Sequence, residues 1–147
     1  MSTDEKVAKD LVETLKDSRN GFSAAAEKLR DSDRGDVATT MQGYADQRAE
    51  FSREIVEMGH EYGDEVDEGG SFAAKLHRGW LSMKDAVSGD DAGGVVEAAA
   101  SGEEHAEKEY RKALDEDISE GFRAVVQRQH DAIAQTVTEL KSTPRND

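Results

Sequence analysis

Cysteine is absent from this sequence of 147 residues, and proline occurs once, at Pro144. Without cysteine the chain has no disulfide, no thiolate nucleophile and no cysteine-bound iron–sulfur cluster. Because proline interrupts helices, its scarcity leaves the chain free to form long helices up to the C-terminal tail. Aromatic residues make up only 5% of the chain and charged residues 35%, a balance that favours long solvated helices over sheets.

Long apolar runs are also missing, since no stretch approaches the roughly 20 apolar residues that span a bilayer. Residues 1–13 are polar and acidic, so we expect no signal peptide, no membrane association and a cytoplasmic location. Basic residues are few, with 19 Lys and Arg against 33 Asp and Glu, which gives a net charge of −14. Such a surface repels nucleic acid and anionic lipid, so we expect neither as a partner.

What the sequence does contain is a set of apolar stripes at helical spacing. The clearest stripe has steps of three, four and seven residues: Val37, Met41, Tyr44, Phe51, Ile55, Met58 and Tyr62. This spacing places side chains on one face of a helix. Similar stripes predict helices over residues 4–30, 36–62, 71–88, 92–115 and 118–140. We therefore predict an all-α protein with one bundle domain over residues 4–141 and a flexible tail at 142–147.

Local signals indicate where these helices begin and how they connect. Ser2 with Glu5, and Asp117 with Glu120, each have the spacing of a capping box. The short turn at residues 31–35 favours an antiparallel pair of helices on either side of it. The acidic, glycine-rich residues 63–70 are the longest candidate loop. The order and packing of the third and fourth predicted helices stay open.

Three stretches of the chain resemble a known family. They are residues 17–27, with Gly21-Phe22 and Ala25-Ala26-Glu27; residues 76–80, Leu-His-Arg-Gly-Trp, with Lys84 after them; and residues 102–114, with Gly102-Glu103-Glu104, Tyr110 and Ala113-Leu114. Together they are similar to an uncharacterised bacterial family of four-helix bundles, a domain of unknown function. The resemblance extends from about Lys6 to Lys141, although Ser18 stands where members often have glycine. It implies a ferritin-like antiparallel four-helix bundle with an additional short helix, and it implies no activity or substrate.

Bundles of this fold often hold two irons, which require an inward Glu on each of two helices and a Glu-x-x-His motif on each of the other two. The chain contains one such motif, Glu57 to His60, but helical spacing turns it away from the apolar stripe of its helix. His130 lacks the matching Glu three residues earlier. Glu13 and Asp17 lie off the stripe of the first helix, so we expect no inward carboxylate there and no complete di-iron site.

A metal site of another kind remains the alternative. Its first candidates are Glu57 and His60, which would bind iron or another divalent ion at the surface or at an interface, followed by His77, Glu103 and Glu104. The simpler interpretation is that the carboxylates are solvated and that His77 is a packing histidine. We therefore predict no cofactor, and keep a divalent metal as the alternative.

Three polar residues fall on the apolar stripes near the middle of their helices: Ser18, Arg48 and Gln129. We predict that they form a buried polar layer, in which Arg48 either snorkels toward solvent or reaches a carboxylate such as Asp17 or Glu13. Buried polar groups cost stability unless they are paired, and one common use of them is to set helix register and the choice of partner. A small anion held inside the bundle is the functional alternative.

The sequence favours no enzymatic reaction, since it contains no phosphate-binding loop, dinucleotide fingerprint or nucleophile elbow. We predict a non-enzymatic protein with a structural or protein-interaction role. Because ferritin-like proteins often assemble through their helix faces, we expect a homo-oligomer, with a dimer as one possibility. The alternative function is metal binding at a degenerate or non-standard site. The sequence does not identify the biological role or a protein partner.

Overall fold

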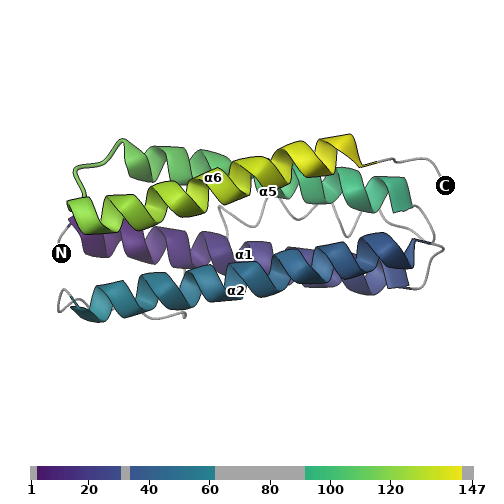
Figure 1. Cartoon of the computed structure of the whole chain (residues 1–147), viewed down its shortest axis with the longest axis horizontal. Helices are drawn as coiled ribbons and strands as arrows, with labels where there is room; N and C mark the ends of the chain where they lie inside the picture. Colours follow the sequence, from purple (N-terminus) through teal and green to yellow (C-terminus); the bar gives the residue numbers. More distant parts are fainter. Residues whose placement is uncertain (1–2, 31–33, 62–91, 144–147) are drawn as a thin grey trace.

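The computed structural model describes residues 3–30, 34–61 and 92–143, and all of the regular structure in these ranges is helical (Figure 1). The helices are α1 (Thr3–Arg30), α2 (Gly35–Glu61), α5 (Ala92–Leu114) and α6 (Glu120–Ser142). Helices were therefore predicted correctly over 4–30, 36–62 and 92–115, within one residue at each end. The helix expected over 71–88, the loop at 63–70 and Ser2 lie outside the described residues. No helix in the described ranges is long and apolar enough to cross a membrane.

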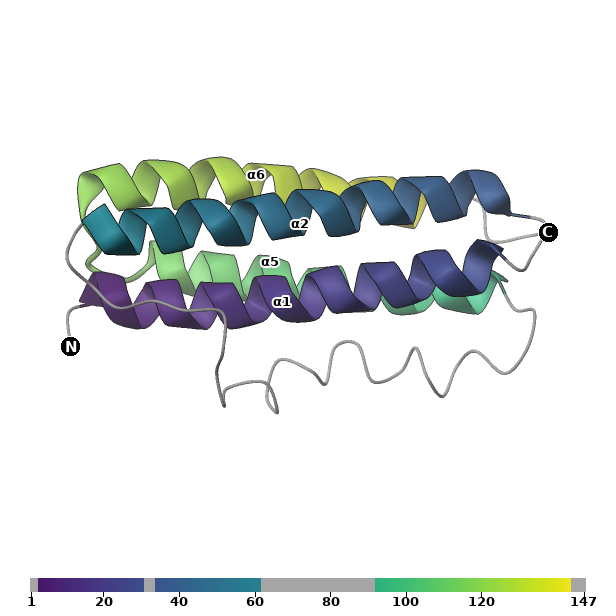
Figure 2. The same ribbon diagram turned by 90° about the horizontal axis from the view of Figure 1, so that it is seen from below.

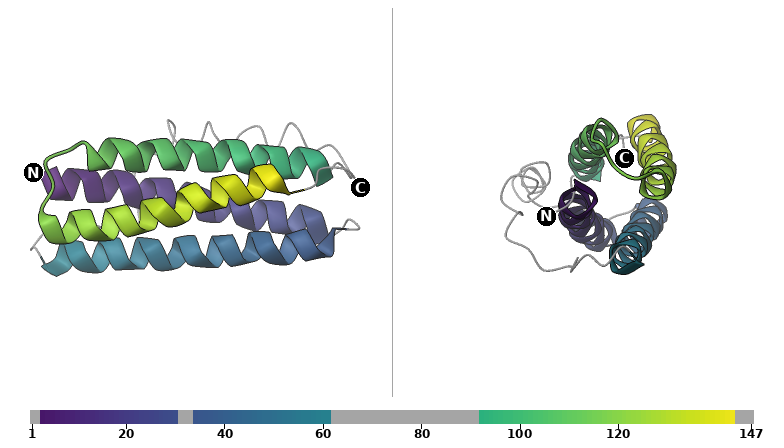
Figure 3. Two further views of the ribbon diagram at one scale, coloured as in Figure 1. Left: turned by 45° about the horizontal axis from the view of Figure 1, so that its top comes forward. Right: turned by 90° about the vertical axis from the view of Figure 1, so that its left-hand side faces the viewer.

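The helices pack as a four-helix bundle made of two antiparallel hairpins. One hairpin is α1 with α2 and the other is α5 with α6, and Figure 2 shows them lying along one common direction. α1 packs against α5 and α2 faces α6, so α2 and α5 occupy diagonally opposite corners in the end-on view (Figure 3). α2 ends and α5 begins at opposite ends of the bundle, which makes these two helices parallel (Figure 1).

The buried residues of α6 show why this sequence forms a bundle helix. They follow one another at alternating steps of four and three: Phe122, Val126, Gln129, Ile133, Thr136 and Leu140. Alternating steps of three and four keep one stripe of side chains facing the neighbouring helices over the whole length. Each large apolar side chain that is fully buried in this way stabilises the fold by about 1.5–3 kcal/mol.

The apolar core divides into two clusters. The Phe22 cluster consists of Phe22, Ala25, Ala26, Leu29, Val37, Ala38, Met41, Ala45, Val95, Val96, Ala98, Ala99, Ala100 and Leu140. The Ile133 cluster consists of Val7, Ala8, Leu11, Val12, Leu15, Phe51, Ile55, Ala106, Tyr110, Ala113, Ile118, Phe122, Val126 and Ile133. Because neighbouring helices are antiparallel, the end of one meets the beginning of the next, and the two clusters occupy opposite halves of the bundle.

The start of α6 differs from the prediction. Asp117 is exposed and the N-cap residue is Ser119, whose side chain makes no capping hydrogen bond, so the predicted capping box was wrong. Tertiary contacts organise this turn instead. The backbone N–H of Ser119 donates to Asp4 Oδ1 of α1 over 2.9 Å. The Arg123 guanidinium donates to the carbonyl oxygens of Leu114 (2.6 Å) and Glu116 (2.8 Å) at the end of α5.

Candidate functional site

A polar layer separates the two apolar clusters, and each helix contributes one residue to it: Ser18, Arg48, Glu103 and Thr136. On every helix this residue falls between the part that belongs to the Phe22 cluster and the part that belongs to the Ile133 cluster. The side chains of Ser18, Arg48 and Glu103 are 0% exposed, and that of Thr136 is 3% exposed. The most buried charges of the described chain therefore lie at one level in the middle of the bundle.

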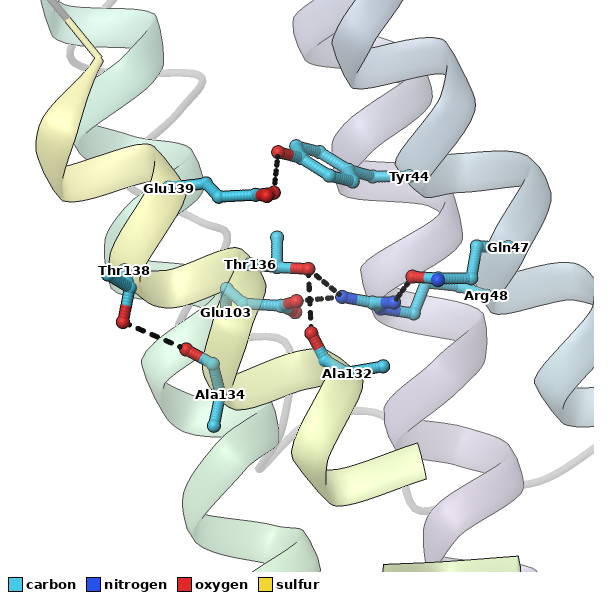
Figure 4. A network of polar contacts seen from close by, with 9 residues as sticks. All are labelled: Tyr44, Gln47, Arg48, Glu103, Ala132, Ala134, Thr136, Thr138 and Glu139. Atoms are coloured by element: carbon cyan, nitrogen blue, oxygen red, sulfur yellow. Dashed lines mark hydrogen bonds and ion pairs between the residues drawn. The ribbon is translucent and has the colours of Figure 1, made fainter. Parts of the chain in front are cut away.

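Arg48 is the centre of this layer (Figure 4). Its Nη2 forms an ion pair with Glu103 Oε2 and donates to Thr136 Oγ1 over 3.3 Å, while its Nη1 donates to Gln47 Oε1. The Thr136 hydroxyl donates in turn to the carbonyl oxygen of Ala132 over 3.0 Å. Arg48 thus connects α2 to both helices of the other hairpin.

An aromatic ring from each cluster lies close to the guanidinium. The Arg48 Cζ lies 5.6 Å from the ring centroid of Phe22 and 5.6 Å from that of Phe51. A guanidinium at this distance from an aromatic face is attracted by the ring quadrupole, which offsets part of its lost hydration. Burial lowers the pKa of Arg48 to about 10, so the side chain remains a cation at neutral pH. The layer therefore contains an internal positive charge at neutral pH.

The hydrogen bonding of this layer is incomplete. Arg48 Nε, Glu103 Oε1 and Ser18 Oγ are buried and have no hydrogen-bond partner among the described residues. A buried polar atom without a partner costs about 1–3 kcal/mol relative to its hydrated state. The bundle therefore keeps the charged groups of Arg48 and Glu103 away from water without giving each of their polar atoms a hydrogen-bond partner among the described residues.

Gln129 belongs to a second buried polar group, one heptad before Thr136 on α6. It lies roughly 10 Å from Thr136 along the helix axis at ~1.5 Å per residue. Its Oε1 accepts a hydrogen bond of 2.7 Å from the Tyr110 hydroxyl, and its Nε2 donates to Glu54 Oε1 (2.9 Å) and to the Phe51 carbonyl oxygen (3.3 Å). Burial raises the pKa of Tyr110 well above its ordinary value, so the phenol is a fixed hydrogen-bond donor. The structure thus buries Ser18, Arg48 and Gln129 but places Gln129 apart from the other two.

Carboxylates of α1 are more buried than the sequence indicated. Glu13 is 4% exposed and Asp17 is 7% exposed, which contradicts the expectation that α1 carries no inward carboxylate. The reason is that the buried surface of α1 is wider than one stripe and includes 14 of its 28 residues. Both carboxylates have interaction partners. The described partner of Arg48 is nevertheless Glu103, which the sequence had suggested only as a metal ligand.

The structure distributes the candidate metal ligands over different surroundings. Glu103 is inside the bundle, whereas Glu104 faces α6 and pairs with Lys141 Nζ over 3.3 Å. Glu57 is exposed on α2. The side chain of His60 and all of His77 lie outside the described residues. Within the described residues, no group of three or more His, Cys, Asp or Glu side chains is arranged to hold a metal ion.

One histidine does have a defined partner at the α5–α6 contact. His130 Nε2 lies 2.8 Å from Glu107 Oε2, and Arg111 Nε contacts the same oxygen at 2.7 Å. This group links α6 to α5 at the bundle surface and contains a single imidazole. It is therefore a structural contact between the two helices.

Sequence reasoning missed Thr136 and the pairing of Arg48 with Glu103. Thr136 follows Gln129 by seven residues on the alternating stripe of α6, so its inward position was available as a signal. Glu103 offered a weaker signal, because it lies among the small residues of α5 and the sequence did not show which helix faced it. Their proximity required the arrangement of all four helices.

These features define a class: an all-helical four-helix bundle whose interior contains a buried arginine–glutamate ion pair. The chain belongs to the family described as Domain of unknown function (DUF2383), whose model matches residues 5–116. The match includes α1, α2 and α5, and it ends before α6. No curated protein and no solved structure matches the chain.

Proposed function

We propose that this chain is a non-enzymatic bundle of ferritin-like connectivity that has a structural or protein-interaction role and associates with itself. The Arg48–Glu103 ion pair in the middle of the bundle carries this proposal. In di-iron bundles, inward carboxylates and histidines from the facing helices converge on two metals. In this bundle the guanidinium of Arg48 supplies the positive charge, and the other two helices, α1 and α6, contribute Ser18 and Thr136.

The connectivity supports the ferritin-like part of the proposal. Ferritin-like folds consist of antiparallel helix pairs with one long crossover connection between the pairs. α2 and α5 are parallel and are separated by residues 62–91, whereas α1–α2 and α5–α6 are antiparallel pairs with short connections (Figure 1). The additional short helix of the predicted fold, over residues 71–88, stays a prediction.

Electrostatics argue against a metal in the polar layer. A divalent cation roughly 5 Å from the Arg48 guanidinium would be repelled by about 7 kcal/mol at an effective dielectric constant of about 20. Glu103 reduces this repulsion, but its Oε2 is already held by Arg48 and is not available to coordinate the ion. The layer is therefore suited to fixing the register of the helices, which is a known use of buried polar groups.

Metal content and oligomeric state together test this function. Protein loaded anaerobically with ferrous iron and then desalted is measured by elemental mass spectrometry, with and without a high-salt wash. We expect a substoichiometric amount that salt removes, because the net charge of −14 attracts cations diffusely. About two salt-resistant irons per chain would contradict the proposal, since that is the content of a di-iron bundle.

The self-association part is tested separately by size-exclusion chromatography with light scattering. We expect one defined oligomer over a range of protein concentrations. A monomer at every concentration would contradict self-association.

A non-standard metal site is the second candidate function, and its ligands would be Glu57 and His60 of α2. The exposed position of Glu57 leaves it accessible to an ion. This alternative predicts stoichiometric, salt-resistant metal that disappears in the Glu57→Ala/His60→Ala variant. A Glu50→Ala variant is the matched control, because it removes another exposed carboxylate of the same helix.

A further inference from the structure

We propose that the bundle opens along the α2–α6 seam, the line on which these two helices face each other, while α1 and α5 remain in contact as a pivot. Of the neighbouring helix pairs, α2 and α6 make the fewest close backbone contacts in the described ranges. Four-helix bundles are usually closed by apolar side chains on every face. The α2–α6 seam is instead bridged to a large extent by polar side-chain tips.

Two of these bridges lie at the surface of the seam. The Tyr44 hydroxyl donates to Glu139 Oε1 over 2.7 Å, and Arg128 pairs with Glu54. The Arg128 side chain is 56% exposed, and that of Glu54 is 36% exposed. Exposed pairs of this kind stabilise by about 0–1 kcal/mol, because water competes for both partners. They hold the seam closed weakly.

The inner bridges are the contacts of Arg48 with Thr136 (3.3 Å) and of Gln129 with the Phe51 carbonyl oxygen (3.3 Å) and Glu54 Oε1 (2.9 Å). Opening the seam exchanges these hydrogen bonds for hydrogen bonds to water. It also rehydrates Arg48 Nε and Glu103 Oε1, which have no hydrogen-bond partner among the described residues when the seam is closed. Because the desolvation of a buried ion pair often equals or exceeds its Coulombic attraction, loss of the pair adds little to the cost of opening.

The two faces that α1 forms are packed more closely than the seam. α1 and α2 pack closely along their length and include the Phe22–Tyr44 ring contact, with centroids 5.2 Å apart. α1 and α5 likewise make many close backbone contacts. Separating those faces rehydrates the buried Glu13 and Asp17 carboxylates of α1, but it also breaks much closer backbone packing and exposes more apolar surface, at a cost of roughly 25 cal/mol for each Å². The seam is therefore the face with the lowest cost of opening.

Opening of the seam changes which side chains the protein exposes to solvent. Closed, the Arg48 guanidinium lies over the rings of Phe22 and Phe51, 5.6 Å from each centroid, and its side chain is 0% exposed. Open, the same cation and rings line the exposed inner surface of two hairpins that still touch through α1 and α5. The fold thus contains a two-state element, and local opening of this kind requires less free energy than global unfolding. The proposal is independent of the function proposed above.

Spin-label distance measurements test this opening directly, and the absence of cysteine allows each label to be placed uniquely. The seam pair is Asp46→Cys/Gln135→Cys, at exposed positions of α2 and α6 that take no part in the bridges. The pivot pair is Lys6→Cys/Lys112→Cys, on α1 and α5, whose side chains line one small hollow between these helices. Distances are measured in increasing urea, and helix content is followed by circular dichroism.

We expect the seam pair to gain a second, longer distance at urea concentrations that leave the helix content and the pivot-pair distance unchanged. Adding Tyr44→Phe/Arg128→Ala should increase the longer population at the same urea concentration. Arg53→Ala is the matched control, since it removes an exposed ion pair with Glu50 within α2 and should leave the distribution as it was. The proposal is overturned if both label pairs lengthen together with the loss of helix content, or if the pivot pair lengthens first.

Discussion

Arg48 of α2 and Glu103 of α5 form an ion pair across the diagonal of the bundle, at the level where the two apolar clusters meet. Both side chains are 0% exposed. Because α2 and α5 belong to different hairpins, the pair connects the two hairpins at this level. A slip of either hairpin by one turn would bring each charge against an apolar cluster, where it would be buried without a partner.

Removing one partner of this pair should be strongly destabilising. We expect Glu103→Ala to lower the free energy of unfolding by about 3–5 kcal/mol, because it leaves the Arg48 charge buried without its counter-ion. Urea unfolding followed by circular dichroism measures the change. A loss below about 1 kcal/mol would show that water reaches the pair and that it behaves as a surface ion pair.

Replacing both partners should have a different effect. We expect Arg48→Met/Glu103→Met to be as stable as the natural protein or more stable, because apolar side chains of similar size avoid the desolvation cost. The same variant should lose conformational specificity, seen as broadened amide resonances or several peaks on a sizing column. A single sharp species would show that the pair is not needed to set the register.

Tyr110 and Gln129 provide a test of the second buried polar group. Tyr110→Phe removes the donor to Gln129 Oε1 and should cost about 1–3 kcal/mol, since a buried acceptor is left without its partner. Tyr44→Phe is the matched control, because the Tyr44 hydroxyl pairs with Glu139 at the surface and its loss should cost less. Equal losses in urea unfolding would mean that burial of the Tyr110 pair makes no difference.

Stability should fall at alkaline pH because of these tyrosines. Burial raises the pKa of Tyr44 and of Tyr110 above the ordinary value of 10.0, and for Tyr44 the hydrogen bond to Glu139 adds to the effect. A raised folded-state pKa contributes stability that is complete below the unfolded-state pKa and is lost as the pH rises through the folded-state pKa. Each hydroxyl therefore favours the folded state less and less above about pH 10.

The measurement compares urea unfolding of the natural protein and of Tyr110→Phe at about pH 9 and about pH 11, on either side of the ordinary tyrosine pKa. The comparison separates the effect of Tyr110 from that of Arg48, because both proteins contain Arg48. The lowered pKa of Arg48 makes stability rise with pH, which is opposite to the effect of the tyrosines. We expect the natural protein to lose more stability than the variant over this interval. The same loss in both would mean that Tyr110 ionises as readily in the folded protein as in the unfolded chain.

The contact between the beginnings of α1 and α6 should also be measurable. Asp4→Ala removes the acceptor of the Ser119 N–H and should lower the free energy of unfolding by about 0.5–2 kcal/mol, as loss of a helix cap does. Asp4→Asn keeps an acceptor oxygen and should cost less. Hydrogen exchange at the first turn of α6 locates the effect, and an unchanged exchange rate there in Asp4→Ala would contradict the assignment.

The sequence predicted the elements well and the site in part. The helix bounds followed from turn residues and from stripes with steps of three and four, which depend only on neighbours along the chain. The burial of Arg48 and Gln129 followed in the same way, because both lie on those stripes. The prediction that α1 has no inward carboxylate was wrong. Glu13 and Asp17 lie off the main stripe of α1 and are nevertheless buried, because this helix has more than one packed face.

The sequence by itself determined the helices, their apolar faces and the polar residues that interrupt those faces, since each follows from the fixed geometry of an α-helix. The tertiary structure alone decided which of these residues meet. Glu103 and Arg48 are 55 residues apart in the chain, and they pair because two antiparallel hairpins place the middles of α2 and α5 at one level. The spacing of side chains on one helix is a local property, whereas the partner of a buried charge depends on the packing of all four.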